Sequence, residues 1–255
     1  MIKGNAAVEP ARTGNDSMTT KQRIGRRLFA NMPITRFLFD QLRVEANAAI
    51  AWVETSTMPR VRRRLKDIKR ARGLLVNVAC GPQALDGFLN IDLFPARPDV
   101  LRWDCRRGLP LSEGSARGIK IEHFVEHLET REELPLVLNA CHRALAPGGV
   151  LRIAVPDAER FIQAYCTGGS SPYGELGLAE LPSDLPTKID VLNHVFHQGH
   201  EHRWGYDYVA LADRLARAGF TTVERSAFRR SRLPELGAAD LSTHERYSLY
   251  VEAVR

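Results

Sequence analysis

The stretch "LLVNVACGPQALDGFLNIDLFP", residues 74 to 95, restricts the fold more than any other part of the chain. It begins like a buried strand that runs into a glycine turn, as in nucleotide-binding α/β domains. Only six residues separate Gly81 from the next apolar run at Phe88. A standard βαβ unit places a helix there, and its acidic residue lies about 20 positions past the turn. Asp92 comes too early for that spacing, so the stretch is either a parallel crossover without a helix or a hairpin.

The length of the connection permits both arrangements. Returning to the start of a parallel strand of about five residues means covering about 17 Å. The seven steps from Gly81 to Phe88 reach about 23 Å when extended. The run FLNID favours the crossover, because a carboxylate at the carboxyl end of a second parallel strand lies where ribose hydroxyls arrive. In a hairpin Asp92 would lie at the opposite edge.

From residue 73 onward, short apolar runs alternate with helical stretches, which is typical of a mostly parallel sheet with helices on its faces. The predicted strands are 74–79, 88–92, about 99–103, 117–122, 149–155, 220–226 and 247–254. The predicted helices are 131–146, 157–166 and 206–218. An arginine-rich stretch without a clear helix joins the last two strands, so we expect them to pair antiparallel.

A chain of 255 residues can bury one substantial core, or one core with a small appendage. We expect residues 1–20 to be disordered, 21–72 to form a basic helical extension and 73–255 to form the main domain. Met18 is an alternative start. Apolar residues at three- and four-residue steps between 34 and 53 predict a helix with one face on the core.

The net charge of +6 is uneven. From Arg60 to Arg72 the stretch RVRRRLKDIKRAR carries eight basic residues against the single acid Asp67. Such a stretch attracts phosphate on nucleic acid or on an anionic lipid surface. A solvated helix face is the alternative, and the sequence leaves both open.

Two features bear on the compartment. No apolar run approaches the roughly 18 residues needed to span a membrane, and the polar start lacks a secretory signal. We therefore expect a cytoplasmic protein, with contact at the inner membrane face open through the basic stretch. The four cysteines are far apart and form no C-x-x-C pair, so neither a disulfide framework nor a thiolate zinc site is expected.

Six motifs, in order, resemble those of class I S-adenosylmethionine-dependent methyltransferases with a shortened first crossover. They lie between residues 76 and 220 and are VNVACG (76–81), FLNID (88–92), WDCRRGLPL (103–111), HFVEHL (123–128), LAPGGVLRIAVPD (145–157) and HRWGYDYVALADRLARAGF (202–220). The resemblance implies a Rossmann-like, doubly wound α/β fold of seven strands, mostly parallel with an antiparallel last strand. It also implies S-adenosylmethionine as the cofactor and methyl transfer as the reaction.

The resemblance assigns residues to each part of the cofactor. The methionine portion would meet Ala79, Cys80 and Gly81, where a glycine lets the backbone pass close to the ligand. The ribose would meet Asp92, and the adenine would meet Asp104 with the Cys105 backbone.

Glu122 and His123 would face the sulfonium and the acceptor. The chain departs from the family pattern at Asn77, where an acid is common, and at Pro82, which replaces a glycine. Taken alone, the same residues also fit a buried strand with a capped turn, and His123, Glu126 and His127 fit a local hydrogen-bond network.

Half of all histidines lie in NHVFHQGHEHRW, at positions 194, 197, 200 and 202. Zinc, an acid/base role and plain loop histidines are the alternatives. No cysteine lies among them and the spacing fits no single-helix zinc motif, so we expect no metal. His202 is the favoured residue, because HRWGY matches the segment that packs over the active site in the resembling family.

Methyl transfer is an in-line displacement, so alignment of the reactants lowers most of the barrier. A hydroxyl acceptor needs a base, and the candidates are His123, Asp157 and His202. Asp157 equally suits a helix cap for the following AERFIQAY.

The favoured acceptor is a small molecule or a glycan, including a lipid-linked one, held by the loops 166–188 and 228–236. An RNA or protein acceptor is the alternative. A nicotinamide-dependent oxidoreductase is disfavoured by the missing G-x-G-x-x-G.

Overall fold

The computed structural model describes residues 34–167, 185 and 187–255. The chain divides into two compact units, residues 1–43 and 44–255. The expected disorder of residues 1–20 and most of the loop 166–188 lie outside the described residues. None of the described helices is long and apolar enough to cross a bilayer.

Two helices precede the sheet, α2 (Arg36–Thr57) and α3 (Pro59–Arg70). A proline suits the first position of α3, because its missing N–H has no partner there. Ile68 of α3 is buried in the main core. Within the second unit, the expectation that the apolar face of α2 packs on the core is wrong, because Ile50 and Val53 are each 45% exposed and the buried positions are alanines.

The sheet has seven strands in the order β3-β2-β1-β4-β5-β7-β6. They are β1 (Leu74–Val78), β2 (Leu89–Asp92), β3 (Leu101–Arg102), β4 (Ala116–Glu122), β5 (Leu145–Pro156), β6 (Thr222–Ser226) and β7 (Ser248–Val254). β7 is antiparallel to both neighbours and the other pairs are parallel. β1 and β2 pair parallel through Asn77 and Asn90 without a helix between them, so the crossover is confirmed and the hairpin is excluded.

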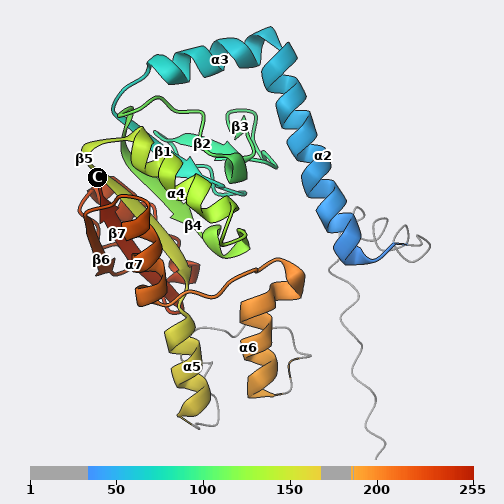
Figure 1. Ribbon diagram of the computed structural model, residues 1–255, viewed down its shortest axis with the longest axis vertical. Helices are drawn as coiled ribbons and strands as arrows, with labels where there is room; N and C mark the ends of the chain where they lie inside the picture. The colour runs from blue at the N-terminus through green and yellow to red at the C-terminus, as the bar shows by residue number, and fades with distance from the viewer. Residues whose placement is uncertain (1–33, 168–184, 186) are drawn as a thin grey trace, which may run out of the picture. The chain divides into compact units, whose positions relative to one another are not determined.

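One face of the sheet is apolar and is covered by α4 (Glu133–Ala144) and α7 (Tyr208–Arg217), both visible in Figure 1. Apolar residues of β4, β5 and β7 pack there against leucines of the two helices. α7 is capped at Asp207, whose side chain accepts from the Ala210 N–H at 2.7 Å. Both helices were expected, and their ends differ by one or two residues from the prediction.

The opposite face carries a polar row across six strands, because residues in register are polar on each of them. The row is Asn90, Asn77, Lys120, Arg152, Glu252 and Glu224. A right-handed helix between β1 and β2 would lie on this face, since that step runs across the sheet in the opposite direction from the step between β4 and β5. The connection between β6 and β7 covers the face instead, with the five-residue helix α8 (Pro234–Ala238) that the sequence did not indicate.

Both apolar packing and charge hold this connection on the sheet. Leu236 is fully buried and lies with Leu75 and Val150. A Cβ added at Gly118 would lie 2.5 Å from Leu233 Cδ2, so the glycine lets the Leu233 side chain pack directly on the strand. Arg152 is 1% exposed and donates to both oxygens of Asp240, at 2.9 and 2.6 Å.

Between β5 and α7 lie α5 (Ala158–Cys166), which was expected, and α6 (Lys188–His197), which was not. The capping box of Thr187 and Asp190 starts α6. Four short 3-10 turns complete the described elements: η1 (Cys105–Arg107), η2 (Val125–His127), η3 (Gln198–His200) and η4 (Ser242–His244).

Candidate cofactor and acceptor sites

The turn after β1 holds two residues with positive φ, Ala79 at 51° and Gly81 at 52°. The Gly81 N–H donates to Asp92 Oδ2 at 2.7 Å, and the Phe94 N–H donates to Asp92 Oδ1 at 2.6 Å. A Cβ added at Gly81 would meet no protein atom within 4 Å. The space where a side chain would stand at Gly81 is therefore empty, so a ligand can approach the backbone closely there.

A cavity of about 310 Å³ lies beside this turn. Five residues expected at the cofactor line it, namely Ala79, Cys80, Gly81, Glu122 and His123. The cavity lies outside the carboxyl ends of β1 and β4. From these two neighbouring strands the sheet continues to β2 and β3 on one side and to β5 on the other, so the strand order reverses here. Ligands of open α/β sheets bind at such switch points.

Glu122 and Lys120 lie two residues apart on β4, so their side chains point to the same face of the sheet. They form an ion pair inside this cavity. Glu122 Oε1 also lies 3.0 Å from His244 Nδ1. Burial acts to raise the pKa of Glu122, but His244 and Lys120 outweigh it and lower the pKa to about 2. Glu122 is therefore a carboxylate at neutral pH, and the cavity has a fixed negative group beside a lysine.

His123 stands between this cavity and a second one. Its backbone has a φ of 51°. Its N–H donates a hydrogen bond to the Ala154 carbonyl oxygen at 2.9 Å. Its Nε2 lies 2.8 Å from Ser248 Oγ, a residue of the second cavity. Its Nδ1 lies 3.2 Å from Glu126 Oε1.

Three further residues assigned to the cofactor do not line the cavity, namely Asp92, Asp104 and Cys105. Asp104 accepts from the Arg106 guanidinium at 2.9 and 2.8 Å, so both of its oxygens are already paired. Cys105 is buried. The adenine contacts assigned to Asp104 and the Cys105 backbone, like the ribose contact of Asp92, stay predictions.

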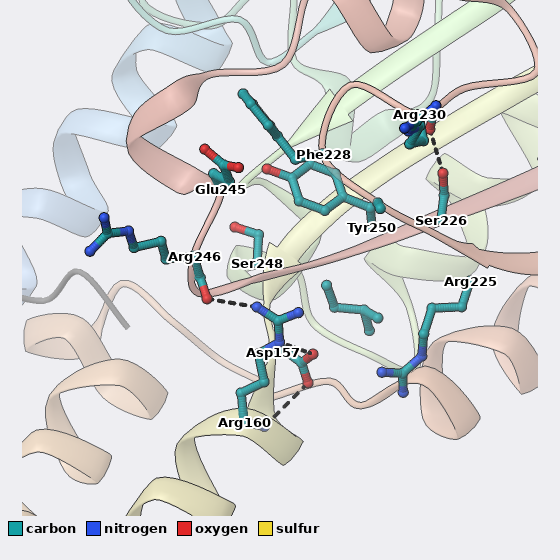
Figure 2. Close-up of a pocket in the computed structure, with 12 residues that line it drawn as sticks. Asp157, Arg160, Arg225, Ser226, Phe228, Arg230, Glu245, Arg246, Ser248 and Tyr250 are labelled. Carbon is teal, nitrogen blue, oxygen red and sulfur yellow. Dashed lines mark hydrogen bonds and ion pairs between the residues drawn. The ribbon is translucent and has the colours of Figure 1, made fainter. Parts of the chain in front are cut away.

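The second cavity, of about 660 Å³, lies at the same carboxyl edge, beyond β5. Four arginines and two acids line it, and the ring of Tyr250 forms part of its wall. Figure 2 shows Arg160 and Arg225 on either side of Asp157. The four arginines outnumber the two acids of the lining, and Arg225 also pairs with Glu159 at 3.0 Å, so a smaller positive excess favours an anion.

Asp157 was expected either to act as a base or to cap the following helix. It is 1% exposed and caps α5. Burial raises its pKa, and the Arg160 N–H and guanidinium act in the opposite direction. Asp157 also lines the second cavity. The geometry therefore gives it the capping role and leaves the role of base as a prediction.

His202 lines neither of these two cavities. It is 7% exposed, and its Nδ1 lies 2.6 Å from the Val195 carbonyl oxygen. Burial lowers its pKa, although Glu126 acts to raise it. Its side chain lies beside Glu126 and His127 of η2, and its N–H donates to the His197 carbonyl oxygen at 3.2 Å.

Sequence reasoning missed Lys120, His244 and Ser248. A single lysine in the apolar strand GIKIE was a usable signal, because a lysine is rarely buried without a partner. Nothing in the sequence pointed to His244 or Ser248, because both come to the site only through the long connection that folds back from β6.

No family model matches the chain, and no curated protein is significantly similar to it. Among solved structures, a SAM-dependent methyltransferase from Archaeoglobus fulgidus is 14% identical over 87% of this chain and all of that one, with a TM-score of 0.44. One from Mesorhizobium loti is 18% identical over 77% of this chain and 96% of that one, also at 0.44. A possible exported protein from Bordetella parapertussis is 16% identical over 78% and 68%, at 0.41. At such values none of these likenesses assigns an activity to the chain.

The class of fold follows from the chain's own sheet. Its strand order runs in opposite directions from β1 and β4, and β7 lies antiparallel between β5 and β6, which makes it a doubly wound, Rossmann-like α/β sheet. The expected fold class is therefore confirmed, with the first crossover helix absent.

Proposed function

We propose that this chain is an S-adenosylmethionine-dependent methyltransferase acting on a small molecule or a glycan. The observation that carries the proposal is the cavity at the switch point of the sheet, lined by the Gly81 turn and the end of β4. Its volume is at the lower end of ligand pockets and suits one part of the cofactor. That part is the methionine portion.

The residues present fit this cofactor. Gly81 leaves open space where a side chain would stand, and Asp92 lies at the end of the adjacent strand. The Glu122 carboxylate and the Lys120 ammonium match the amino and carboxylate groups of an amino acid in charge. When bound, the cofactor supplies an electrophilic methyl group.

The chain's own residues align the acceptor and remove its proton. His123 is the proposed base, because it lines the cofactor cavity and contacts Ser248 of the second cavity. A base so placed reaches a hydroxyl between the two cavities. Asp157 stays a second candidate from the side of the second cavity.

We assign the acceptor to the second cavity. Its size of about 660 Å³ falls within the range of small-molecule sites. Its excess of arginines supports an acceptor with a phosphate or carboxylate group.

Replacing Gly81 with alanine is expected to lower the affinity for S-adenosylmethionine at least about tenfold, about 1.4 kcal/mol. The added methyl group enters the open space at the turn, and the positive φ is unfavourable for alanine. Isothermal titration with S-adenosylmethionine, S-adenosylhomocysteine and NAD measures the change.

Gly114→Ala is the matched control, because Gly114 has a φ of 62°, equally open surroundings and no place in the cavity. Equal losses in both variants would assign the effect to backbone strain alone. Binding of NAD without binding of S-adenosylmethionine by the parent would favour an oxidoreductase.

The basic helix α3 supports a peripheral contact with an anionic membrane surface, in keeping with a cytoplasmic location. Arg62 and Arg63 are exposed and have no ion pair among the described residues. Changing both to glutamine is expected to weaken binding to anionic vesicles about tenfold to thirtyfold, at about 1 kcal/mol per charge.

Cosedimentation at rising salt measures this binding, and Arg131→Gln with Arg217→Gln removes the same charge elsewhere. Salt-independent binding would contradict an electrostatic contact. Binding to RNA in place of vesicles would favour the nucleic-acid alternative.

A further inference from the structure

Three side chains from two separate segments meet beside η2. Glu126, His127 and His202 each offer one ligand atom, and these atoms lie within 4.8 Å of one another. Glu126 is 1% exposed, and neither of its carboxylate oxygens has a hydrogen-bond partner. His123 Nδ1 lies 3.2 Å from Glu126 Oε1 but does not form a hydrogen bond of good geometry. A buried carboxylate in this state is costly unless a cation compensates it.

The backbone orients both histidines toward this carboxylate by the same device. His202 Nδ1 contacts the Val195 carbonyl oxygen at 2.6 Å, and His127 Nδ1 contacts the Glu201 carbonyl oxygen at 3.0 Å. A carbonyl partner at Nδ1 places the proton there, which leaves Nε2 with its lone pair. Metal-binding histidines are held in this manner, through a hydrogen bond from the nitrogen that does not bind the metal.

The backbone around the cluster is also fixed. The N–H groups of Arg203 and Trp204 both donate to the Glu126 carbonyl oxygen, at 2.7 and 3.2 Å. These bonds tie the segment after η3 to η2, so the three side chains come from a framework that exists without any ligand. Preorganisation of this kind lowers the cost of binding.

We propose that Glu126, His127 and His202 form a binding site for a divalent transition metal ion, with zinc as the first candidate. Two imidazoles and one carboxylate are a ligand set that zinc accepts. In a tetrahedral site with bonds of about 2.0–2.1 Å, ligand atoms lie about 3.4 Å apart. The three ligand atoms lie within 4.8 Å of one another in the structure. Side-chain rotations that shorten these distances by little more than about 1 Å give the tetrahedral geometry.

This site differs from the one that the sequence suggested. The histidine segment alone offered no complete ligand set, and no metal was expected. The structure leaves His194 and His197 outside the cluster and brings in Glu126 and His127, which the sequence indicated only as a local network.

Three protein ligands are the number at zinc sites that keep one position for water or substrate, whereas structural sites use four. His123 lies between Glu126 and the two cavities. Glu126, His127 and His202 themselves line neither cavity, so the open position would take a water molecule. Metal binding at this cluster does not depend on the proposed function.

The test uses the full chain, purified without chelator and with its affinity tag removed. Equilibrium dialysis against zinc followed by elemental analysis is expected to give one equivalent per chain. The Glu126→Gln and His127→Ala variants are expected to lose at least tenfold to a hundredfold in zinc affinity. Cobalt in place of zinc should give the visible absorption of a four-coordinate site in the parent only.

His197→Ala is the matched control, because this exposed histidine lies in the same segment but outside the cluster. It should keep its full equivalent. Binding of S-adenosylmethionine, measured on the same samples, reports folding and separates a failure of the metal site from a failure of the proposed function. Substoichiometric zinc in the parent, or an unchanged affinity in both cluster variants, would overturn the proposal.

Discussion

Replacing Arg152 with alanine is expected to lower the free energy of unfolding by about 3–5 kcal/mol. Its guanidinium is the only described partner that compensates both Asp240 and Glu252, whose side chains are 0% and 1% exposed. It also donates to the Ala227 and Arg230 carbonyl oxygens, at 2.8 and 2.7 Å. The variant therefore leaves two buried carboxylates without this compensating charge, and each keeps a backbone N–H donor, from Arg229 and Arg232. Urea unfolding followed by circular dichroism measures the loss.

Arg117→Ala is the control, because the pair of Arg117 with Glu235 is 42% and 44% exposed. Such a surface pair contributes about 0–1 kcal/mol. Combining Arg152→Met with Asp240→Asn and Glu252→Gln should recover part of the loss, since the uncompensated charges disappear together. A single Arg152→Ala variant as stable as Arg117→Ala would show that the connection does not depend on this network.

Changing both Arg160 and Arg225 to glutamine is expected to lower kcat/KM for the acceptor about a hundredfold to ten-thousandfold. Each would lose a hydrogen bond to a charged group, which contributes about 1.5–3 kcal/mol. The two guanidinium groups flank Asp157 in the second cavity (Figure 2). Transfer of labelled methyl from S-adenosylmethionine into the small-molecule and glycan fractions of an extract measures the effect.

Arg217→Gln is matched to these two, because Arg217 is an exposed arginine with a surface ion pair to Asp213. It should transfer like the parent. Cofactor affinity should stay the same in all variants, because Arg160 and Arg225 do not line the first cavity. Undiminished transfer by the double variant would place the acceptor elsewhere.

Local patterns were sufficient for the elements that local forces form. The apolar run of β1, the glycine turn and FLNID predicted a parallel crossover without a helix, because chain length and the place of Asp92 leave few arrangements. The alternation of apolar and helical stretches predicted the strands and a mostly parallel sheet, whereas the order of the strands within the sheet came from the structure. Two helices, α6 and α8, were missed, because their sequences look like loops and their ends depend on capping and on the packing of Leu236.

The site was only partly accessible for the same reason. Ala79, Cys80 and Gly81 are neighbours in sequence, so a motif identifies them together. Lys120, His244 and Ser248 join them from β4, η4 and β7, and no local pattern links those positions. A motif can also assign a residue that the structure uses differently. The motif places Asp104 at the adenine, but the structure pairs its carboxylate with Arg106.

By itself, the sequence determined the class of fold, the parallel crossover and the glycine turn, since backbone preference and hydrophobic periodicity act over a few residues. Only the tertiary structure decided what covers the polar face of the sheet, and which groups compensate Arg152 and Glu122. Those partners are 88 residues apart for Arg152 and Asp240, and 122 apart for Glu122 and His244. A buried charge needs a group of opposite charge beside it, and which residue provides that group depends on how distant segments fold together.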